Sequence, residues 1–223
     1  MRLYLVRHGE PNYELDCLTE NGKIQAEKAA DVLQNVKFDK VYCSSQGRAH
    51  ETCMATCRRI NMEPIVVDWA REDLGGQYFG IIDPDNRWTW IFWSKKYGPY
   101  LRNEEVMKLG RYWYKSPYFQ DTKVEEGVKI MNKSVDEFML ENGYKHDRDN
   151  CQYIKVGDTP DTIILFAHGG FGVSFLSSLL DIPYNVFSTS FQHFDLTGIT
   201  TIDFNGDNCR PIVIRYNDIH HLD

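Results

Sequence analysis

The stretch LYLVRHGE, residues 3–10, joins a short apolar run to an arginine, a histidine, a glycine and a glutamate. The apolar run predicts a buried β-strand, and the polar residues mark the carboxyl end of that strand. A second stretch, DTIILFAHGG at residues 161–170, is a near-continuous apolar run that also ends in His-Gly. In open parallel sheets, ligands bind in the crevice at the carboxyl ends of the strands. If the two strands are neighbours, we therefore expect His8 and His168 to face each other across one pocket.

The order of the other elements favours an α/β fold. Strands and helices alternate at first, which implies parallel strands joined by crossover helices. The elements expected there are strand 2–6, helix 19–35, strand 40–43, helix 48–60 and strand 64–67. Those expected later are helix 125–141, a loop or hairpin at 142–158, a strand from 161, helix 171–180 and strands 198–204 and 211–216. We expect a three-layer α/β/α fold with a mostly parallel central sheet. Thr19 is the expected N-cap of the first helix, and Ile24 is expected on its apolar side.

Residues 78–120 interrupt this alternation. The segment holds four of the five tryptophans, together with many tyrosines and phenylalanines. We interpret it as an aromatic-rich helical cap inserted into a single domain that spans residues 1–223. Such a cap is expected to reach over the pocket and to influence which substrate binds.

Composition excludes several classes of function. The chain has 223 residues and a net charge of −7, which argues against nucleic acid or an anionic membrane surface as the partner. No apolar stretch approaches the length of a membrane span. The six cysteines form no C-x-x-C pair, so neither a zinc ribbon nor a thioredoxin-type motif is predicted. With no export signal visible, we expect reduced thiols and a cytoplasmic location.

The residues at the predicted strand ends form a cationic cluster. Arg7 precedes His8, and Arg48 begins the helix that follows the second strand. Gly169 begins another helix, whose free backbone amides can also reach the crevice. Two histidines, two arginines and two helix N-termini around one cleft are typical of a site for a phosphate or a similar oxyanion.

Five blocks of sequence carry a family resemblance. They are RHGE at 7–10, LTENGKIQA at 18–26, SSQGRAHET at 44–52, EDLGGQYFG at 72–80 and FAHGG at 166–170. Together and in this order they resemble the histidine phosphatase superfamily, which also includes the cofactor-dependent phosphoglycerate mutases. The resemblance implies a phosphatase that acts on a small phosphorylated metabolite through a phosphohistidine and uses neither a cofactor nor a metal.

The resemblance also implies a role for each matching residue. His8 matches the nucleophile, which must be neutral in order to attack phosphorus. Arg7, Arg48 and His168 match the residues that hold the phosphate oxygens. Glu72 matches the proton donor, which protonates the leaving oxygen and later activates water.

The sequence departs from the family after RHGE. Where the family often has a threonine and, three residues later, an asparagine near the phosphate, this chain has Pro11 and Glu14. A carboxylate beside phosphate is repulsive. Either Glu14 points away from the pocket, or Asn12 takes over as a phosphate contact.

Three alternatives remain open from the residues. His8, His168 and Glu72 could form a two-histidine, one-carboxylate metal site, although Arg7 and Arg48 oppose a divalent cation there. A phosphoglycerate mutase is a second alternative, but Asp73 would repel the carboxylate of that substrate. A non-catalytic domain that binds a phosphorylated ligand or a protein is the third.

Overall fold

The core of the molecule is a six-stranded sheet in the order β13-β11-β1-β10-β4-β5. The computed structural model describes residues 1–191 and 194–223. The strands are β1 (Arg2–Arg7), β4 (Lys40–Ser44), β5 (Ile65–Val67), β10 (Thr162–Ala167), β11 (Ile199–Asp203) and β13 (Ile212–Asp218). The four strands from β1 to β5 in this order run parallel, and β11 and β13 run antiparallel at the other edge. The expectation of a mostly parallel central sheet is confirmed.

The two strands that end in His-Gly lie side by side. β1 pairs with β10 in parallel, and the register aligns Arg7 with Ala167, so His8 and His168 follow at the same edge of the sheet. Leu3, Val6 and the five β10 residues after Thr162 are fully buried. Strands that are covered on both faces have apolar side chains on both sides, which explains the near-continuous apolar runs.

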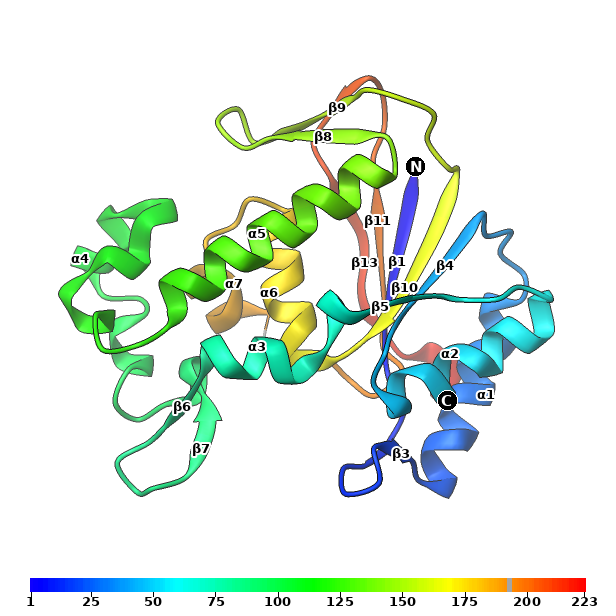
Figure 1. Cartoon of the computed structure of the whole chain (residues 1–223), viewed down its shortest axis with the longest axis horizontal. Helices are drawn as coiled ribbons and strands as arrows, with labels where there is room; N and C mark the ends of the chain where they lie inside the picture. The colour runs from blue at the N-terminus through cyan, green and yellow to red at the C-terminus, as the bar shows by residue number, and fades with distance from the viewer. Residues whose placement is uncertain (192–193) are drawn as a thin grey trace.

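Helices cover both faces of this sheet (Figure 1). The helices are α1 (Glu20–Leu33), α2 (Gly47–Ile60), α3 (Glu72–Phe79), α4 (Glu104–Lys108), α5 (Val124–Glu141), α6 (Gly169–Leu179) and α7 (Tyr184–Ser190). Buried residues of α1 and α2 pack with Val6 and Phe166 from one face of the sheet. Buried residues of α5 and α6 pack with Leu5 and Leu165 from the other. The three-layer α/β/α class is therefore confirmed.

The segment expected to be a helical cap begins with a hairpin and continues with helical turns. α3 runs up to Phe79, and a hairpin follows, formed by β6 (Gly80–Ile82) and β7 (Trp88–Trp90). Beyond the hairpin come four 3₁₀ turns and one short α-helix, α4; the turns are Ile91–Trp93, Gly98–Tyr100, Gly110–Lys115 and Pro117–Phe119. The helical character expected of the insertion is thus found beyond the hairpin. The hairpin itself was not predicted, although the Trp-Thr-Trp alternation of β7 has the two-residue period of a strand. Asn86 in the intervening loop has a φ of 60°, a left-handed conformation that asparagine tolerates.

Other predicted elements agree with the structure or shift slightly. Thr19 caps α1 by accepting a bond from the Gly22 amide, but Ile24 is 59% exposed and does not belong to the apolar side. The loop or hairpin expected at 142–158 is a hairpin of β8 (Tyr144–Asp147) and β9 (Gln152–Lys155), extended by β12 (Asn208–Cys209). A short hairpin of β2 (Pro11–Asn12) and β3 (Cys17–Leu18) follows β1. Within the described ranges, no helix has the length and apolar character needed to cross a membrane.

Candidate active site

The site begins where β1 and β10 end. His8 and His168 are each 1% exposed, and their ring centroids lie 5.2 Å apart. The His8 amide donates to the Ala167 carbonyl over 3.0 Å, and the Thr197 amide donates to the His8 carbonyl over 3.2 Å. The main chain of His8 is thus held by the end of β10 and by the residues just before β11.

Hydrogen bonding sets the tautomer of His8. Its Nδ1 lies 2.7 Å from the Gly9 carbonyl oxygen, which can only accept, so Nδ1 carries the proton and Nε2 has the lone pair. Burial, followed by the Arg7 and Arg48 charges, lowers the pKa of His8 to about 3, although the Gly9 carbonyl opposes the shift. A neutral imidazole with a free Nε2 lone pair is the form that a nucleophile requires. Gly9 is needed here because a Cβ would lie 2.5 Å from the Gly22 carbonyl oxygen of α1.

His168 is also neutral and lies between the sheet and the proposed acid. Its Nε2 is 2.9 Å from the Ser44 hydroxyl, and its Nδ1 is 3.5 Å from Oε2 of Glu72. Burial, and then the neighbouring His8 ring and the Arg48 and Arg7 charges, hold the pKa of His168 well below its usual range. As the residue just before α6, it places the first amides of that helix beside the site.

Glu72 is the first residue of α3. Its amide donates to Oε1 of Gln46 over 2.6 Å, and its own Oε1 accepts from the Phe171 amide of α6 over 3.1 Å. Burial raises the pKa of Glu72, while Arg48, Arg7 and the α6 amides oppose the rise. Because burial prevails, the protonated form of this carboxyl persists to higher pH than for an ordinary glutamate.

The two arginines have different surroundings. Arg48, in the first turn of α2, donates from Nε to Nε2 of His8 over 3.3 Å and from a terminal nitrogen to Oδ1 of Asp16 over 2.5 Å. Asp16 also accepts from the Gly47 amide over 2.7 Å, so one carboxylate binds both Arg48 and the start of α2. Arg7 donates from a terminal nitrogen to the Phe194 carbonyl, and its Nε is buried without a hydrogen-bond partner among the described residues.

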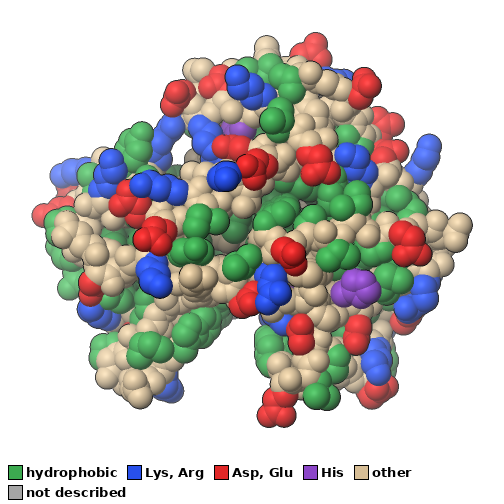
Figure 2. Space-filling view, viewed as in Figure 1, with side chains coloured by type: hydrophobic (Ala, Val, Ile, Leu, Met, Phe, Trp, Pro, Cys, Tyr) green, Lys and Arg blue, Asp and Glu red, His purple; other side chains and the backbone are tan. Residues whose placement is uncertain are grey.

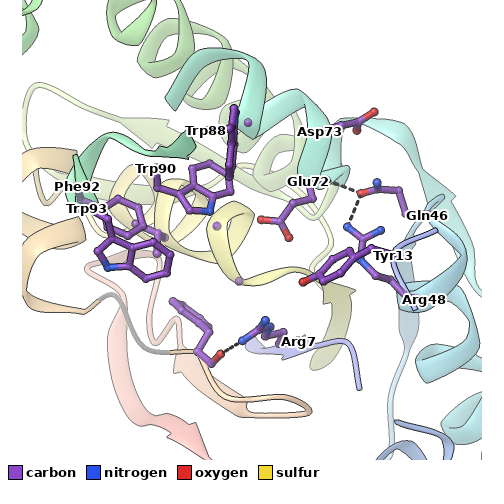
Figure 3. A pocket seen from close by; sticks show the side chains of 15 residues that line it. Arg7, Tyr13, Gln46, Arg48, Glu72, Asp73, Trp88, Trp90, Phe92 and Trp93 are labelled. Atoms are coloured by element: carbon purple, nitrogen blue, oxygen red, sulfur yellow. Dashed lines mark hydrogen bonds between the residues drawn. The ribbon is translucent and has the colours of Figure 1, made fainter. Parts of the chain in front are cut away.

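A cleft of about 540 Å³ opens above these groups. In Figure 2 the molecule is hollowed between the β6–β7 hairpin and the β2–β3 loop. Figure 3 shows Arg7, Arg48 and Tyr13 at one end, indole rings at the other, and the Glu72 carboxylate between them. The lining consists of Arg7, Tyr13, Gln46, Arg48, Glu72, Asp73, Gly76, Trp88, Trp90, Phe92, Trp93, Gly169, Gly170, Val173 and Phe194. The arrangement suits a phosphate at the cationic end and the rest of a molecule toward the indoles.

Comparison with known proteins agrees with this geometry. The family model described as Histidine phosphatase superfamily (branch 1) matches residues 3–107, a range that includes His8, Arg48 and Glu72. Over this range the chain is similar to the histidine phosphatase superfamily. A relative from Hydrogenobacter thermophilus, named "Putative phosphoserine phosphatase 2", is 26% identical over 99% of this chain and 97% of its own length.

Solved histidine phosphatases share the fold. A phosphoserine phosphatase variant from Entamoeba histolytica, in complex with phosphoserine, has a TM-score of 0.61 at 20% identity, covering 99% of this chain and 98% of its own. A mycobacterial glucosyl-3-phosphoglycerate phosphatase has a TM-score of 0.60 at 19% identity, with coverage of 97% and 98%. The α-ribazole phosphatase from Shigella flexneri has a TM-score of 0.61 at 19% identity, with coverage of 98% and 97%.

The fold brings most of the predicted site residues together. Arg7, His8, Arg48, Glu72 and His168 converge at the cationic end of the cleft, and Gly169 lines it. Asn12 is not part of the lining, since its Oδ1 accepts from the amides of Glu14 and Leu15 over 3.1 and 3.2 Å. Glu14 is exposed on the same loop. The side chain of Asn12 thus stabilises its own loop.

Sequence reasoning missed four residues of this site. Ser44 and Gln46 lie in the block SSQGRAHET and hold His168 and Glu72, so their place in that block was a usable signal. Asp16 and Tyr13 reach Arg48 from the β2–β3 loop; the Tyr13 ring centroid is 5.4 Å from the guanidinium carbon. Nothing in the local sequence marks these two residues, because their contact depends on how the loop folds onto α2.

The donor atoms of a possible metal site do approach one another. One ligand atom from each of His8, Glu72 and His168 lies within 4.8 Å of the others. The guanidinium groups of Arg7 and Arg48 beside them disfavour a second concentrated positive charge. The donor set therefore fits phosphate chemistry better than metal binding.

Proposed function

We propose that this chain is a phosphomonoester hydrolase that acts on a small phosphorylated metabolite through a phosphohistidine intermediate. One observation carries the proposal: the lone pair of neutral His8 Nε2 lies against Arg48, with Glu72 nearby. A nucleophile, a cationic clamp and a proton donor are the three parts that such a reaction needs.

In the first step, Arg7, Arg48, His168 and the Gly169 amide hold the phosphate oxygens. Arg48 turns from Nε2 of His8 toward the phosphate, which leaves the lone pair free to attack phosphorus. The new N–P bond forms as the ester P–O bond breaks, and Glu72 gives its proton to the leaving alkoxide oxygen. The products are an alcohol, phospho-His8 and an ionised Glu72.

In the second step, the same carboxylate acts as a base. Glu72 takes a proton from water, and the water oxygen attacks phosphorus as the N–P bond breaks. Inorganic phosphate leaves, His8 returns to its neutral form and Glu72 is protonated again. One residue serves as acid and then as base because the steps consume and regenerate the same proton.

The phosphoglycerate mutase alternative requires a free cation to bind the carboxylate of its substrate. Arg71 is near, but it donates to both oxygens of Asp73 over 3.0 and 2.6 Å, and Asp73 itself lines the cleft. The neutralised pair offers little attraction to a second anionic group. A non-catalytic domain that only binds a phosphorylated ligand would need neither the nucleophile His8 nor the proton donor Glu72.

Two further properties belong to this proposal. The reaction needs no metal, since two arginines and the α6 amides offset the phosphate charge. The protein works in the cytoplasm; its six cysteines are all free thiols, and Cys43, Cys53 and Cys57 are buried in the core.

Phosphoenzyme trapping tests the proposed function. The wild-type protein is mixed briefly with a radiolabelled phosphomonoester and quenched, and acid-labile, base-stable label is measured alongside turnover of nitrophenyl phosphate. His8→Ala should show no label and less than about 1% of wild-type turnover. His220→Ala is the matched control, because this histidine is exposed outside the cleft, and it should behave as wild type. A folded His8→Ala protein that retains more than a few per cent of turnover would remove His8 as the nucleophile.

A further inference from the structure

The end of the cleft opposite the arginines is walled by four aromatic side chains. Trp88, Trp90, Phe92 and Trp93 come from β7 and the 3₁₀ turn after it, and all four line the cleft (Figure 3). Trp88 is 54% exposed and Trp93 is 57% exposed. Large apolar side chains that gather at an open cleft, rather than in the core, indicate a surface that binds something apolar.

Packing fixes the rings of this aromatic wall. A Cβ at Gly170 would lie 2.1 Å from the Trp90 ring and 2.6 Å from Oε1 of Glu72, so the indole and the acid meet at the start of α6. A Cβ would lie 3.4 Å from the Trp88 ring at Gly76 of α3 and 2.6 Å from it at Gly80, the first residue of β6, so this indole lies over the end of α3. Both tryptophans therefore depend on glycines in the blocks EDLGGQYFG and FAHGG.

The rings also have defined orientations relative to one another. The Trp90 and Phe92 rings are nearly parallel, at 7° with centroids 6.1 Å apart. Trp88 and Trp93 stand at 71° and 70° to these neighbours. Offset and edge-to-face contacts with such rings favour a planar aromatic guest over a flexible aliphatic one.

Charge at this end of the cleft disfavours an anionic guest. Among the lining residues that the structure describes, the cations are Arg7 and Arg48, and both lie at the phosphate end. The acids among the same described lining residues are Glu72 and Asp73, and the charge of Asp73 is balanced by Arg71. A carboxylate on the leaving group would lose its hydration without gaining an unpaired cation.

We propose, on the basis of the proposed hydrolase function, that the preferred substrate is a phosphomonoester whose leaving group carries an uncharged, planar aromatic or heteroaromatic ring. The phosphate lies between Arg7 and Arg48, and the ring lies against Trp88, Trp90, Phe92 and Trp93. The cleft volume of about 540 Å³ falls within the range of roughly 300–1,000 Å³ that is usual for sites of this kind. A compact amino-acid phosphate would leave the aromatic wall uncovered.

Matched alkyl phosphates test the preference. The leaving groups of naphthylmethyl phosphate, propyl phosphate and phosphoserine are all primary alcohols. Differences in kcat/KM among the three substrates therefore report mainly on how the leaving group binds. We expect naphthylmethyl phosphate to exceed propyl phosphate by about tenfold or more, with phosphoserine the poorest. Naphthylmethyl phosphate no better than propyl phosphate, or phosphoserine as the best of the three, overturns the inference.

Binding measured without turnover separates this inference from the proposed function. Calorimetric titration compares naphthylmethylphosphonate with propylphosphonate, neither of which has an ester bond to hydrolyse. Absence of turnover on every phosphomonoester together with about tenfold tighter binding of the aromatic phosphonate contradicts the hydrolase but supports the aromatic site. Equal affinities contradict the aromatic site, whatever the turnover.

Variants locate the preference on the wall. Trp93→Ala and Trp88→Ala should each lower the naphthylmethyl-to-propyl ratio of kcat/KM by about fivefold, and Trp93→Phe should restore much of it. Tyr112→Ala is the control: this tyrosine is 51% exposed in the same insertion but lies outside the cleft, so the ratio should not change. An unchanged ratio in both tryptophan variants overturns the assignment.

Discussion

The two ends of the cleft are built in different ways. The phosphate end takes its side chains from the ends of β1 and β10 and from the starts of α2, α3 and α6, and its histidines are almost fully buried. The aromatic end takes its side chains from a hairpin outside the main sheet, and two of its tryptophans are more than half exposed. Groups that perform chemistry need fixed geometry, which a sheet edge supplies. Groups that select a leaving group can vary with an insertion that the sheet does not constrain.

Loss of the acid at the phosphate end should have the largest effect on the reaction. Glu72→Gln removes the proton that an alkoxide needs but that nitrophenolate hardly needs. Formation of phospho-His8 should slow by about 10²- to 10⁴-fold with an alkyl phosphate and only mildly with nitrophenyl phosphate. Rapid-quench kinetics with both substrates measure this step directly. Equal slowing for both leaving groups would show that Glu72 is not the donor.

The pH profile provides a control on the same residue. The donor must be protonated, so wild-type kcat/KM on alkyl phosphates should fall as pH rises through the pKa of Glu72. Burial raises that pKa, which places the fall at higher pH than for an exposed glutamate. The same fall in Glu72→Gln would assign it to another group.

A methyl group added at Gly170, where the phosphate end and the aromatic end of the cleft meet, should have the next largest effect on turnover. Gly170→Ala places a Cβ against both the Trp90 ring and the Glu72 carboxylate. Displacement of the acid by about 1 Å can cost about 10²-fold in kcat. Gly157→Ala is the matched control, because a Cβ there meets nothing within 4 Å. Wild-type turnover in a folded Gly170→Ala protein would mean that the added methyl group does not displace the Glu72 carboxylate.

A smaller effect is expected at the rim of the phosphate end. Asp16 and a bound phosphate compete for Arg48, so Asp16→Asn should tighten binding of inorganic phosphate. The pair is partly exposed, with Asp16 at 41%, so the gain should be about two- to fivefold in Kd by calorimetry. Glu14→Gln changes the charge of the same loop without touching Arg48 and should leave Kd unchanged. Weaker binding in Asp16→Asn would instead show that Asp16 orients Arg48 for the phosphate.

The smallest expected effect is that of metal removal. Exhaustive chelation should leave turnover unchanged, because the arginines and amides already offset the charge of the phosphate. Turnover is measured before and after chelation, and again after addition of zinc, manganese or magnesium. A loss that one of these ions restores would favour the metal-site alternative on His8, Glu72 and His168.

Local sequence predicted the phosphate end well. The apolar runs before His8 and His168 indicated buried strands, and alternation with amphipathic helices indicated parallel pairing. Once the sheet is parallel, residues that follow neighbouring strands must meet at one edge. The five residues Arg7, His8, Arg48, Glu72 and His168 could thus be grouped without a structure. Four of them follow a strand or begin a helix, and Glu72 was added through the family resemblance.

Tertiary structure alone decided the features that depend on distant packing. The contact of Asp16 with Arg48 joins a loop to a helix across 32 positions, and no periodicity marks such a pair. Ile24 has an apolar side chain at a helix position that the fold leaves exposed. Residues 80–93 form a hairpin and turn whose aromatic side chains line a cleft rather than a helical core, because α3 and α6 offer glycines against which the indoles pack. Sequence determined where the chemistry lies, since strand ends converge by geometry; the choice of leaving group depends on side chains that only the folded chain brings together.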